Sequence, residues 1–262
     1  MTKIGFIGGG KMAEAIIKGL NAAKSDWEIH VSDPDPARRE HLHDLYSVKS
    51  HVNNEQLVEL VDVIVLSIKP QMFLSVVEDL TVKPDQLVIS IAAGITIGFL
   101  ENAFPQAPVI RVMPNNPALV RAGISAFTLG HKASKSHQAQ VEKIFGAVGE
   151  VVQVEEKLMD AVTGLSGSGP AYVYLMIEAL AAAGCELGLT QDVAEKLAAH
   201  TVFGAAQTLL KTEHSAAELR AMVTSPGGTT LEGLKVLEDK KFFHSLVAAV
   251  KAAAARSQQL SQ

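Results

Sequence analysis

The sequence predicts an α/β fold in which an N-terminal doubly wound parallel sheet is followed by an all-helical domain. Short apolar runs rich in β-branched residues alternate with helical segments over residues 1–157. Apolar strands of this kind are typical of a parallel sheet that is covered on both faces. Residues 158–262 show no strand pattern, so we place the domain boundary after residue 157.

The elements of the first domain follow one another in a βαβ pattern. Strands are expected at residues 4–8, 28–31, 63–68, 87–91, 109–112, 124–128 and 151–154. Helices are expected between them, at residues 11–23, 36–45, 54–60, 72–78, 97–103 and 135–145. This order is typical of a doubly wound sheet.

The second domain is predicted to be helical throughout. Residues 171–187 are apolar almost all round, and residues 191–211 and 216–223 continue the helical pattern. One face of a final helix is marked at a spacing of three and four by Phe243, Leu246, Val247, Val250 and Ala254. A helix that is apolar on every side of so small a domain needs another subunit to cover it. We therefore expect a homo-oligomer.

The composition excludes several classes of partner. The chain has 262 residues, is 48% hydrophobic and 19% charged, and carries a formal net charge of −5. This balance does not favour a nucleic-acid or membrane-surface partner. No apolar run reaches the roughly 20 residues that span a bilayer, and no secretory signal pattern opens the chain. With one cysteine only, we expect a cytoplasmic protein.

A glycine-rich turn after the first strand predicts a dinucleotide site. Gly8, Gly9, Gly10, Lys11 and Met12 precede Ala13 in the form G-x-G-x-x-A, between a strand and a helix. Gly8 allows the tight turn, and Gly10 allows the backbone to approach a pyrophosphate at the helix N-terminus. The first domain is therefore expected to be Rossmann-like.

The end of the second strand bears on the choice between NAD and NADP. Asp33 lies where an acid accepts hydrogen bonds from a ribose 2′-hydroxyl and repels a 2′-phosphate. Arg38 and Arg39, in the same stretch, could instead pair with that phosphate. Alternatively, Asp33 begins a turn and caps the next helix, with both arginines solvated. The sequence leaves these alternatives open.

Two further strand ends are expected to face the cofactor, because ligands of open parallel sheets lie at the carboxyl ends of strands. The first comprises Ser67, Ile68, Lys69 and Pro70. The second carries Asn115 between two prolines, either as a rigid hydrogen-bonding group near the nicotinamide or as part of a simple turn.

The stretch SPGGTT interrupts the helical domain and predicts an anion site. Thr229-x-x-Glu232 has the form of a capping box for the helix that follows. The glycines and the second threonine indicate more than a cap. Gly227, Gly228, Thr229 and Thr230 are expected to offer backbone N–H groups to a carboxylate, and Thr230 also offers a hydroxyl.

Motifs for other chemistry are missing from the sequence. The histidines have no metal-ligand spacing and no partner cysteine, so no metal site is expected. A nucleophile motif such as G-x-S-x-G is likewise absent.

The motifs taken together resemble the pyrroline-5-carboxylate reductase family, in order and over essentially the whole chain. They are FIGGGKMAEAI, SIKPQ, SIAAGIT, RVMPNNPALV, GLSGSGPAYVY and SPGGTTLEGL. The resemblance implies an NAD(P)H-dependent oxidoreductase that reduces 1-pyrroline-5-carboxylate to L-proline in the last step of proline biosynthesis. It also implies a helical domain that dimerises, with homodimers or decamers as the assembly, and NADPH as cofactor with NADH as the alternative.

Site residues are carried over from the family onto matching positions. Ile7, Gly8, Gly9, Gly10, Lys11 and Met12 match the phosphate loop, Asn54 matches a cofactor-contacting asparagine, and Ser67, Ile68, Lys69 and Pro70 match a second cofactor loop. Ser225, Gly227, Gly228, Thr229 and Thr230 match the carboxylate-binding residues, with Thr230 beside the ring nitrogen as the candidate catalytic residue. Asp33 departs from the small polar residues frequent there in NADPH-using members, which puts strict NADPH preference in doubt.

Two other functions compete with this expectation. A related two-domain hydroxy-acid dehydrogenase or another imine reductase would share the plan, but a hydroxy acid needs a base that SPGGTT does not supply. A non-enzymatic NAD(P)H-binding regulator would have no reason to keep a carboxylate site in the second domain.

Overall fold

The computed structural model describes residues 2–23 and 26–260 of the chain. They form two compact units. Unit 1 consists of Met1–Ser168 together with Ala252–Gln262, and unit 2 is Gly169–Lys251. The chain therefore leaves unit 1 once and returns to it at its C-terminal end. The predicted boundary after residue 157 stays a prediction.

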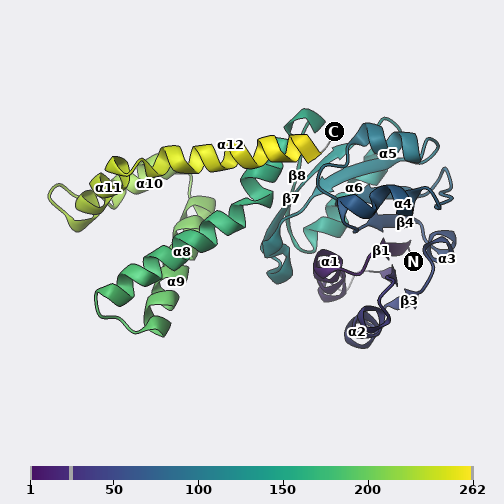
Figure 1. Cartoon of the computed structure of the whole chain (residues 1–262), viewed down its shortest axis with the longest axis horizontal. Helices are drawn as coiled ribbons and strands as arrows, with labels where there is room; N and C mark the ends of the chain where they lie inside the picture. Colours follow the sequence, from purple (N-terminus) through teal and green to yellow (C-terminus); the bar gives the residue numbers. More distant parts are fainter. Residues whose placement is uncertain (1, 24–25, 261–262) are drawn as a thin grey trace. The chain divides into compact units, whose positions relative to one another are not determined.

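Unit 1 is built on an eight-stranded sheet with the strand order β3-β2-β1-β4-β5-β6-β7-β8 (Figure 1). The strands are β1 Thr2–Ile7, β2 Trp27–Ser32, β3 Lys49–His51, β4 Val63–Leu66, β5 Leu87–Ser90, β6 Val109–Met113, β7 Gly123–Leu129 and β8 Gly149–Gln153. Neighbouring strands are parallel except at the β6–β7 pair. The order reverses between β1 and β4, where open α/β sheets bind their ligands. The predicted doubly wound class is confirmed, with β3 and the antiparallel pair as additions.

The segments between the strands are mostly helical. They are α1 Lys11–Ala22, α2 Pro36–Tyr46, α3 Asn54–Leu60, η1 Pro70–Met72, α4 Phe73–Val77, α5 Ile97–Ala103, η2 Asn116–Val120 and α6 Lys135–Gly146, followed after β8 by η3 Glu156–Leu158, α7 Met159–Val162 and the π-helical turn η4 Thr163–Gly167.

Two hydrophobic layers enclose the sheet, and β4 shows how one strand serves both. Val63 and Val65 pack in the layer that contains α1, α2 and α6. Ile64 and Leu66 pack in the layer that contains α3, α4 and α5. Successive side chains of a strand point to opposite faces, so an unbroken apolar run is needed where both faces are covered.

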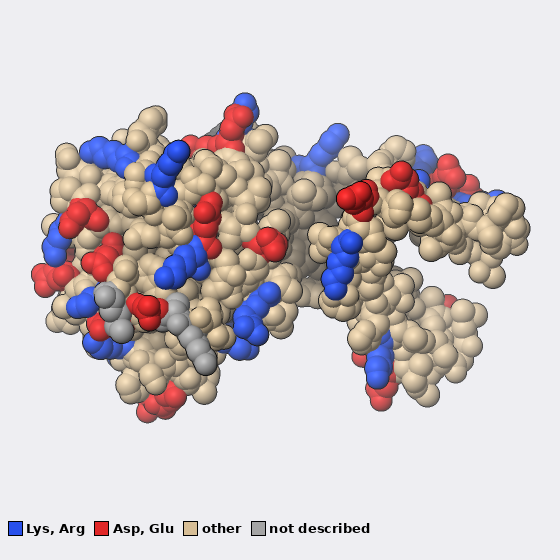
Figure 2. Space-filling model, turned by 180° about the vertical axis from the view of Figure 1, so that it is seen from behind, with Lys and Arg blue, Asp and Glu red and all other residues tan. Residues whose placement is uncertain are grey.

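Unit 2 contains only helices among its described elements: α8 Gly169–Glu186, α9 Gln191–Lys211, α10 Ala216–Met222, α11 Thr229–Asp239 and the first part of α12 Phe242–Leu260. Its own core is small. Ala181 of α8 packs against Ala194 and Ala198 of α9. Large apolar side chains lie outside that core, including Leu175, which is 66% exposed, and Leu210, which is 84% exposed. On the face of this unit seen in Figure 2, side chains of both charges appear, separated by broad uncharged areas.

The C-terminal end of α12 is tied into unit 1 by a polar contact. Ser257 is buried, and its Oγ donates to Oδ1 of Asp160 at 2.7 Å. Within residues 2–23 and 26–260, no helix has the length and apolar character needed to cross a bilayer.

Candidate functional site

The turn between β1 and α1 depends on glycine at position 8. Gly8 has a φ of +90°, and a Cβ there would lie 2.6 Å from the carbonyl oxygen of Ser67. A positive φ is strained for most residues, and the approach of the two backbones leaves no room for a side chain. Gly8 therefore fixes the path of the loop between two adjacent parallel strands.

Gly10 is a glycine for another reason. It is the N-cap of α1, its φ of −62° suits any residue, and no protein atom lies within 4 Å of the place where a Cβ would stand. No side chain caps α1, so the N–H groups of its first turn, which begins with Lys11 and Met12, have no intrahelical acceptors. This free space and these donors fit a dinucleotide pyrophosphate.

Ser67, which directly follows β4, is hydrogen-bonded to the turn between β1 and α1. Its Oγ bonds to the carbonyl oxygen of Ile7 at 3.0 Å and to that of Gly8. The Ile68 side chain also lies against Gly8, while Lys69 and Pro70 begin η1. The structure therefore brings Ser67 and Ile68 to the phosphate turn, and the predicted roles of Lys69 and Pro70 toward a cofactor stay predictions.

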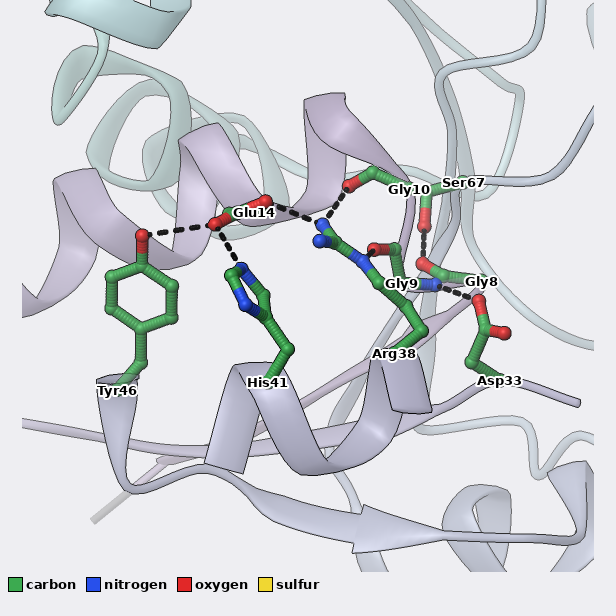
Figure 3. A network of polar contacts seen from close by, with 9 residues as sticks. All are labelled: Gly8, Gly9, Gly10, Glu14, Asp33, Arg38, His41, Tyr46 and Ser67. Carbon is green, nitrogen blue, oxygen red and sulfur yellow. Dashed lines mark hydrogen bonds and ion pairs between the residues drawn. The ribbon is translucent and has the colours of Figure 1, made fainter. Parts of the chain in front are cut away.

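Asp33 contacts the same turn, and Asn54 contacts the last residue of β2. Asp33 Oδ2 accepts from the backbone N–H of Gly9 at 2.8 Å (Figure 3). Asn54 Oδ1 accepts from Ser32 Oγ at 2.7 Å. The alternative in which Asp33 caps α2 is wrong, because the N-cap is Asp35, whose carboxylate accepts from Ala37 N–H at 3.0 Å.

A polar network between α1 and α2 escapes the sequence-based analysis. Arg38 donates from Nε to the Gly9 carbonyl oxygen and from Nη2 to Glu14 Oε2 at 2.5 Å (Figure 3). Glu14 also accepts from His41 Nε2 at 2.9 Å and from the Tyr46 hydroxyl at 3.1 Å. Arg38 is thus not solvated. The signal available in the sequence is Glu14 in the first turn of α1, which is the acid nearest to the glycine loop along the chain.

The side chain of Asn115 is buried and is hydrogen-bonded to the neighbouring strand β7. It is 8% exposed, and its Oδ1 accepts from Ile124 N–H of β7 at 3.0 Å. The bond joins the start of η2 to the antiparallel strand. The acceptor oxygen of the side chain is therefore already in use, and a contact between Asn115 and nicotinamide stays a prediction.

An ion pair between a buried arginine and a partly exposed glutamate connects β6, α5 and η3. Arg111 on β6 is 4% exposed, and its Nη1 lies 3.4 Å from Glu156 Oε1. The same oxygen accepts from Ile97 N–H, the first residue of α5, at 2.6 Å. Burial lowers the pKa of Arg111, and Glu156 opposes that effect. The pair ties η3 to the strand that ends in the MPNNP segment.

The SPGGTT loop of unit 2 is a turn followed directly by a helix. Gly228 N–H donates to the Ser225 carbonyl oxygen at 3.0 Å, and Gly227 has a φ of +71°. With Pro226 before that glycine, this is the pattern of a type II turn. A Cβ on Gly228 would lie 2.4 Å from Ser225 Oγ. The positive φ therefore favours glycine at position 227, and a side chain at position 228 would force the Ser225 hydroxyl to move.

The capping box predicted at this loop is wrong. α11 begins at Thr229, with Gly228 as its N-cap and no capping side chain, and Glu232 pairs with Lys235 at 2.7 Å. The turn leaves Gly228 extended, so Thr229 already lies inside the helix and cannot act as its cap. The exposed N–H groups of Thr229 and Thr230 are the donors that remain for an anion.

The described residues hold no group of three or more His, Cys, Asp or Glu side chains arranged for a metal ion. The glycine turn belongs to unit 1 and the SPGGTT loop to unit 2.

Two family models match the chain. Residues 156–260 match "Pyrroline-5-carboxylate reductase dimerisation", and residues 3–94 match "NADP oxidoreductase coenzyme F420-dependent". A curated relative from Synechocystis sp., a pyrroline-5-carboxylate reductase, is 45% identical over 99% of this chain and 98% of its own length.

Solved structures agree with this similarity. A pyrroline-5-carboxylate reductase from Coxiella burnetii matches with a TM-score of 0.92 and 38% identity, over 100% of this chain and 99% of that one. The Plasmodium falciparum pyrroline carboxylate reductase with NADP bound matches with a TM-score of 0.90 and 31% identity, over 100% and 98% of the two chains.

Proposed function

Since the chain belongs to the pyrroline-5-carboxylate reductase family, we propose that the start of α11 binds the substrate carboxylate and that the β1–α1 turn binds the cofactor. The enzyme reduces the cyclic imine 1-pyrroline-5-carboxylate to L-proline with a nicotinamide cofactor. That cofactor supplies a hydride to the imine carbon, and the imine nitrogen takes up a proton. The residues of this chain have to bind the cofactor and the imine, orient them toward each other, and assist the transfer of a proton to the imine nitrogen.

The cofactor half of the site rests on the turn at Gly8, Gly9 and Gly10. The open space at Gly10 and the free N–H groups of Lys11 and Met12 receive the pyrophosphate. In this proposal Asp33, which is bonded to Gly9, and Asn54, which is bonded to Ser32, face the ribose of the cofactor. NADPH is the cofactor implied by the NADP-bound relative, and NADH is the alternative.

The substrate half rests on one observation: α11 starts without a capping side chain. Its first N–H groups and the positive end of its dipole therefore remain available to a carboxylate. Ser225, Gly227, Gly228 and Thr229 give the loop its shape and its donors. A carboxylate fixed in this way holds the ring in one orientation, and positioning contributes several kcal/mol to such reactions.

Thr230 is the residue that acts on the ring nitrogen in this proposal. It is exposed in the first turn of α11, and its hydroxyl can donate a hydrogen bond. A hydroxyl is a weak acid, and SPGGTT contains no other titratable side chain. Thr230 therefore orients the nitrogen and relays a proton, while water or the protonated iminium form of the substrate is the source.

The helical domain is the proposed assembly surface. The dimerisation model covers residues 156–260, and the isolated unit leaves large apolar side chains such as Leu175 and Leu210 exposed. We propose a homodimer as the smallest active form, with a decamer as the larger alternative, and a cytoplasmic location. Sedimentation velocity on the purified chain distinguishes monomer, dimer and decamer.

The test of function is an assay of NADPH and NADH oxidation with pyrroline-5-carboxylate. We expect turnover with that imine and none with hydroxy-acid or keto-acid substrates. Turnover with a keto acid at a comparable rate would favour the related dehydrogenase, and no turnover with either cofactor would overturn the reductase.

A further inference from the structure

The ribose end of the cofactor turn carries a carboxylate that is held in place before any ligand binds. Asp33 Oδ2 accepts from Gly9 N–H at 2.8 Å, and Oδ1 accepts from Asp35 N–H at 2.9 Å. A carboxylate has about four acceptor sites, so two backbone donors leave room for a hydroxyl group. Asp33 can therefore accept from a ribose 2′-hydroxyl, whereas a 2′-phosphate there would meet a fixed negative charge.

Arg38 contacts this turn from α2, and its guanidinium is already occupied. Nε donates to the Gly9 carbonyl oxygen, and Nη2 lies 3.3 Å from the Gly10 carbonyl oxygen and 2.5 Å from Glu14 Oε2. Figure 3 shows the Arg38 head between these groups. The side chains of Arg38 and Glu14 are only 23% and 20% exposed, so water screens this ion pair weakly.

Glu14 stays ionised in this place. Burial opposes its ionisation, but hydrogen bonds from His41, Arg38 and Tyr46 outweigh burial and hold the pKa of Glu14 below its ordinary value. Its negative charge therefore cancels that of Arg38 at neutral pH. Arg39, also on α2, is hydrogen-bonded to the segment before that helix, where Nη1 donates to the carbonyl oxygens of Asp33 at 2.6 Å and Pro34 at 3.2 Å.

We propose that Glu14 and Asp33 together set cofactor specificity, so that this enzyme binds NADH more tightly than NADPH. Asp33 repels the 2′-phosphate directly, and Glu14 removes Arg38 as its counter-charge. The inference rests on the proposed cofactor site. The preference for NADH is proposed for the residues of this chain and not for the whole family, because a relative in the family has been solved with NADP bound.

The test is a calorimetric titration of the intact oligomer with NADH and with NADPH, in the absence of pyrroline-5-carboxylate. The wild type is expected to bind NADH with a Kd about tenfold lower than that of NADPH. Asp33→Ser should shift the ratio of the two Kd values toward NADPH by about tenfold, because it removes the fixed charge. Equal affinities, or tighter NADPH binding by the wild type, would overturn the proposal.

Glu14→Gln isolates the second residue, because it removes the charge and keeps the shape. NADPH affinity should rise about fivefold and NADH affinity should stay nearly constant, since Arg38 is released toward the phosphate. In the otherwise native chain, Arg38→Met should leave the ratio of the two Kd values, for NADPH and NADH, unchanged. This variant still tests the proposal if Glu14→Gln fails to fold. Selective loss of NADPH binding in Arg38→Met would contradict the proposal.

Glu28→Gln is the matched control, because it removes one acid from β2 away from the turn and should shift neither Kd. Binding is measured without turnover, so the outcomes separate from those of the reductase assay. Tighter NADH binding without imine reduction would leave the specificity standing and overturn the function. Binding of neither dinucleotide would overturn both.

Discussion

Gly228 lies so close to Ser225 that a Cβ on the glycine would stand 2.4 Å from the serine Oγ. The two residues close the turn from which α11 starts, with Gly228 N–H bonded to the Ser225 carbonyl oxygen at 3.0 Å. A side chain at position 228 would therefore displace the Ser225 hydroxyl, and with it one wall of the proposed carboxylate site.

Gly228→Ala tests that dependence. The added methyl group displaces Ser225 or opens the turn, so the N–H groups of α11 lose their alignment and the KM for pyrroline-5-carboxylate should rise roughly 10- to 100-fold. The Kd of the cofactor should not change. Gly98→Ala in α5 is the control, because no atom lies within 4 Å of its Cβ position. Equal KM values for the two variants would show that the turn does not shape the substrate site.

Thr230→Ala should lower kcat/KM by roughly 10- to 100-fold, the effect of losing one hydrogen bond to a charged group. Cofactor affinity, measured by titration, should stay close to that of the wild type. Thr230→Ser keeps the hydroxyl and should keep most of the activity. A wild-type rate in Thr230→Ala would remove this residue from the mechanism.

Gly8→Ala and Gly10→Ala should separate folding from binding. Gly8 combines a φ of +90° with a backbone oxygen 2.6 Å from its Cβ position, so alanine there should lower both the Tm and the cofactor affinity. Gly10 faces open space, so alanine there should lower only the affinity, because its methyl group occupies the pyrophosphate position. Thermal unfolding and cofactor titration check the pair, and unaltered binding in Gly10→Ala would contradict the proposed cradle.

Glu28 predicts a pH dependence of stability. Hydrogen bonds from Lys49 and His30 lower its pKa from 4.5 to about 2. A carboxylate whose pKa is depressed by folding stabilises the protein above its unfolded pKa, and this contribution is lost as the pH falls from about 4.5 toward 2. The gap in urea midpoint between the wild type and Glu28→Gln should therefore narrow from neutral pH to about pH 3. A constant gap would show that Glu28 is not ion-paired in the folded state.

The fold could be predicted from the sequence because its signals are local. Runs such as residues 63–66 are short and apolar without a break, which is typical of a strand covered on both faces, and the observed β4 is buried along its whole length. β3 could not be predicted in this way. It has three residues, two of them exposed, and it forms because His30 and its neighbours in β2 offer an unpaired edge. The antiparallel direction of β7 is likewise a property of the assembled sheet.

The candidate site could be predicted only in part. Gly8 and Asp33 could be predicted as site residues because their spacing from the first strand is typical of a dinucleotide-binding turn. In the structure, Asp33 accepts a hydrogen bond from Gly9 of that turn. The partner of Arg38 could not be identified, since Glu14 lies 24 residues away on another helix. The glycines of SPGGTT indicate a ligand from their pattern, whereas the structure gives a second reason for them: the positive φ of Gly227 and the close approach of Gly228 to Ser225.

The return of α12 to unit 1 has a consequence for engineering. The chain enters the helical unit at Gly169 and leaves it at Lys251, and Ser257 anchors the last turns of α12 to Asp160. The helical unit is thus an insertion with two junctions rather than a tail with one. A chimera that exchanges this cassette between relatives has to cut at both junctions, because a single crossover near residue 157 would separate Asp160 and Ser257 from the unit that they complete.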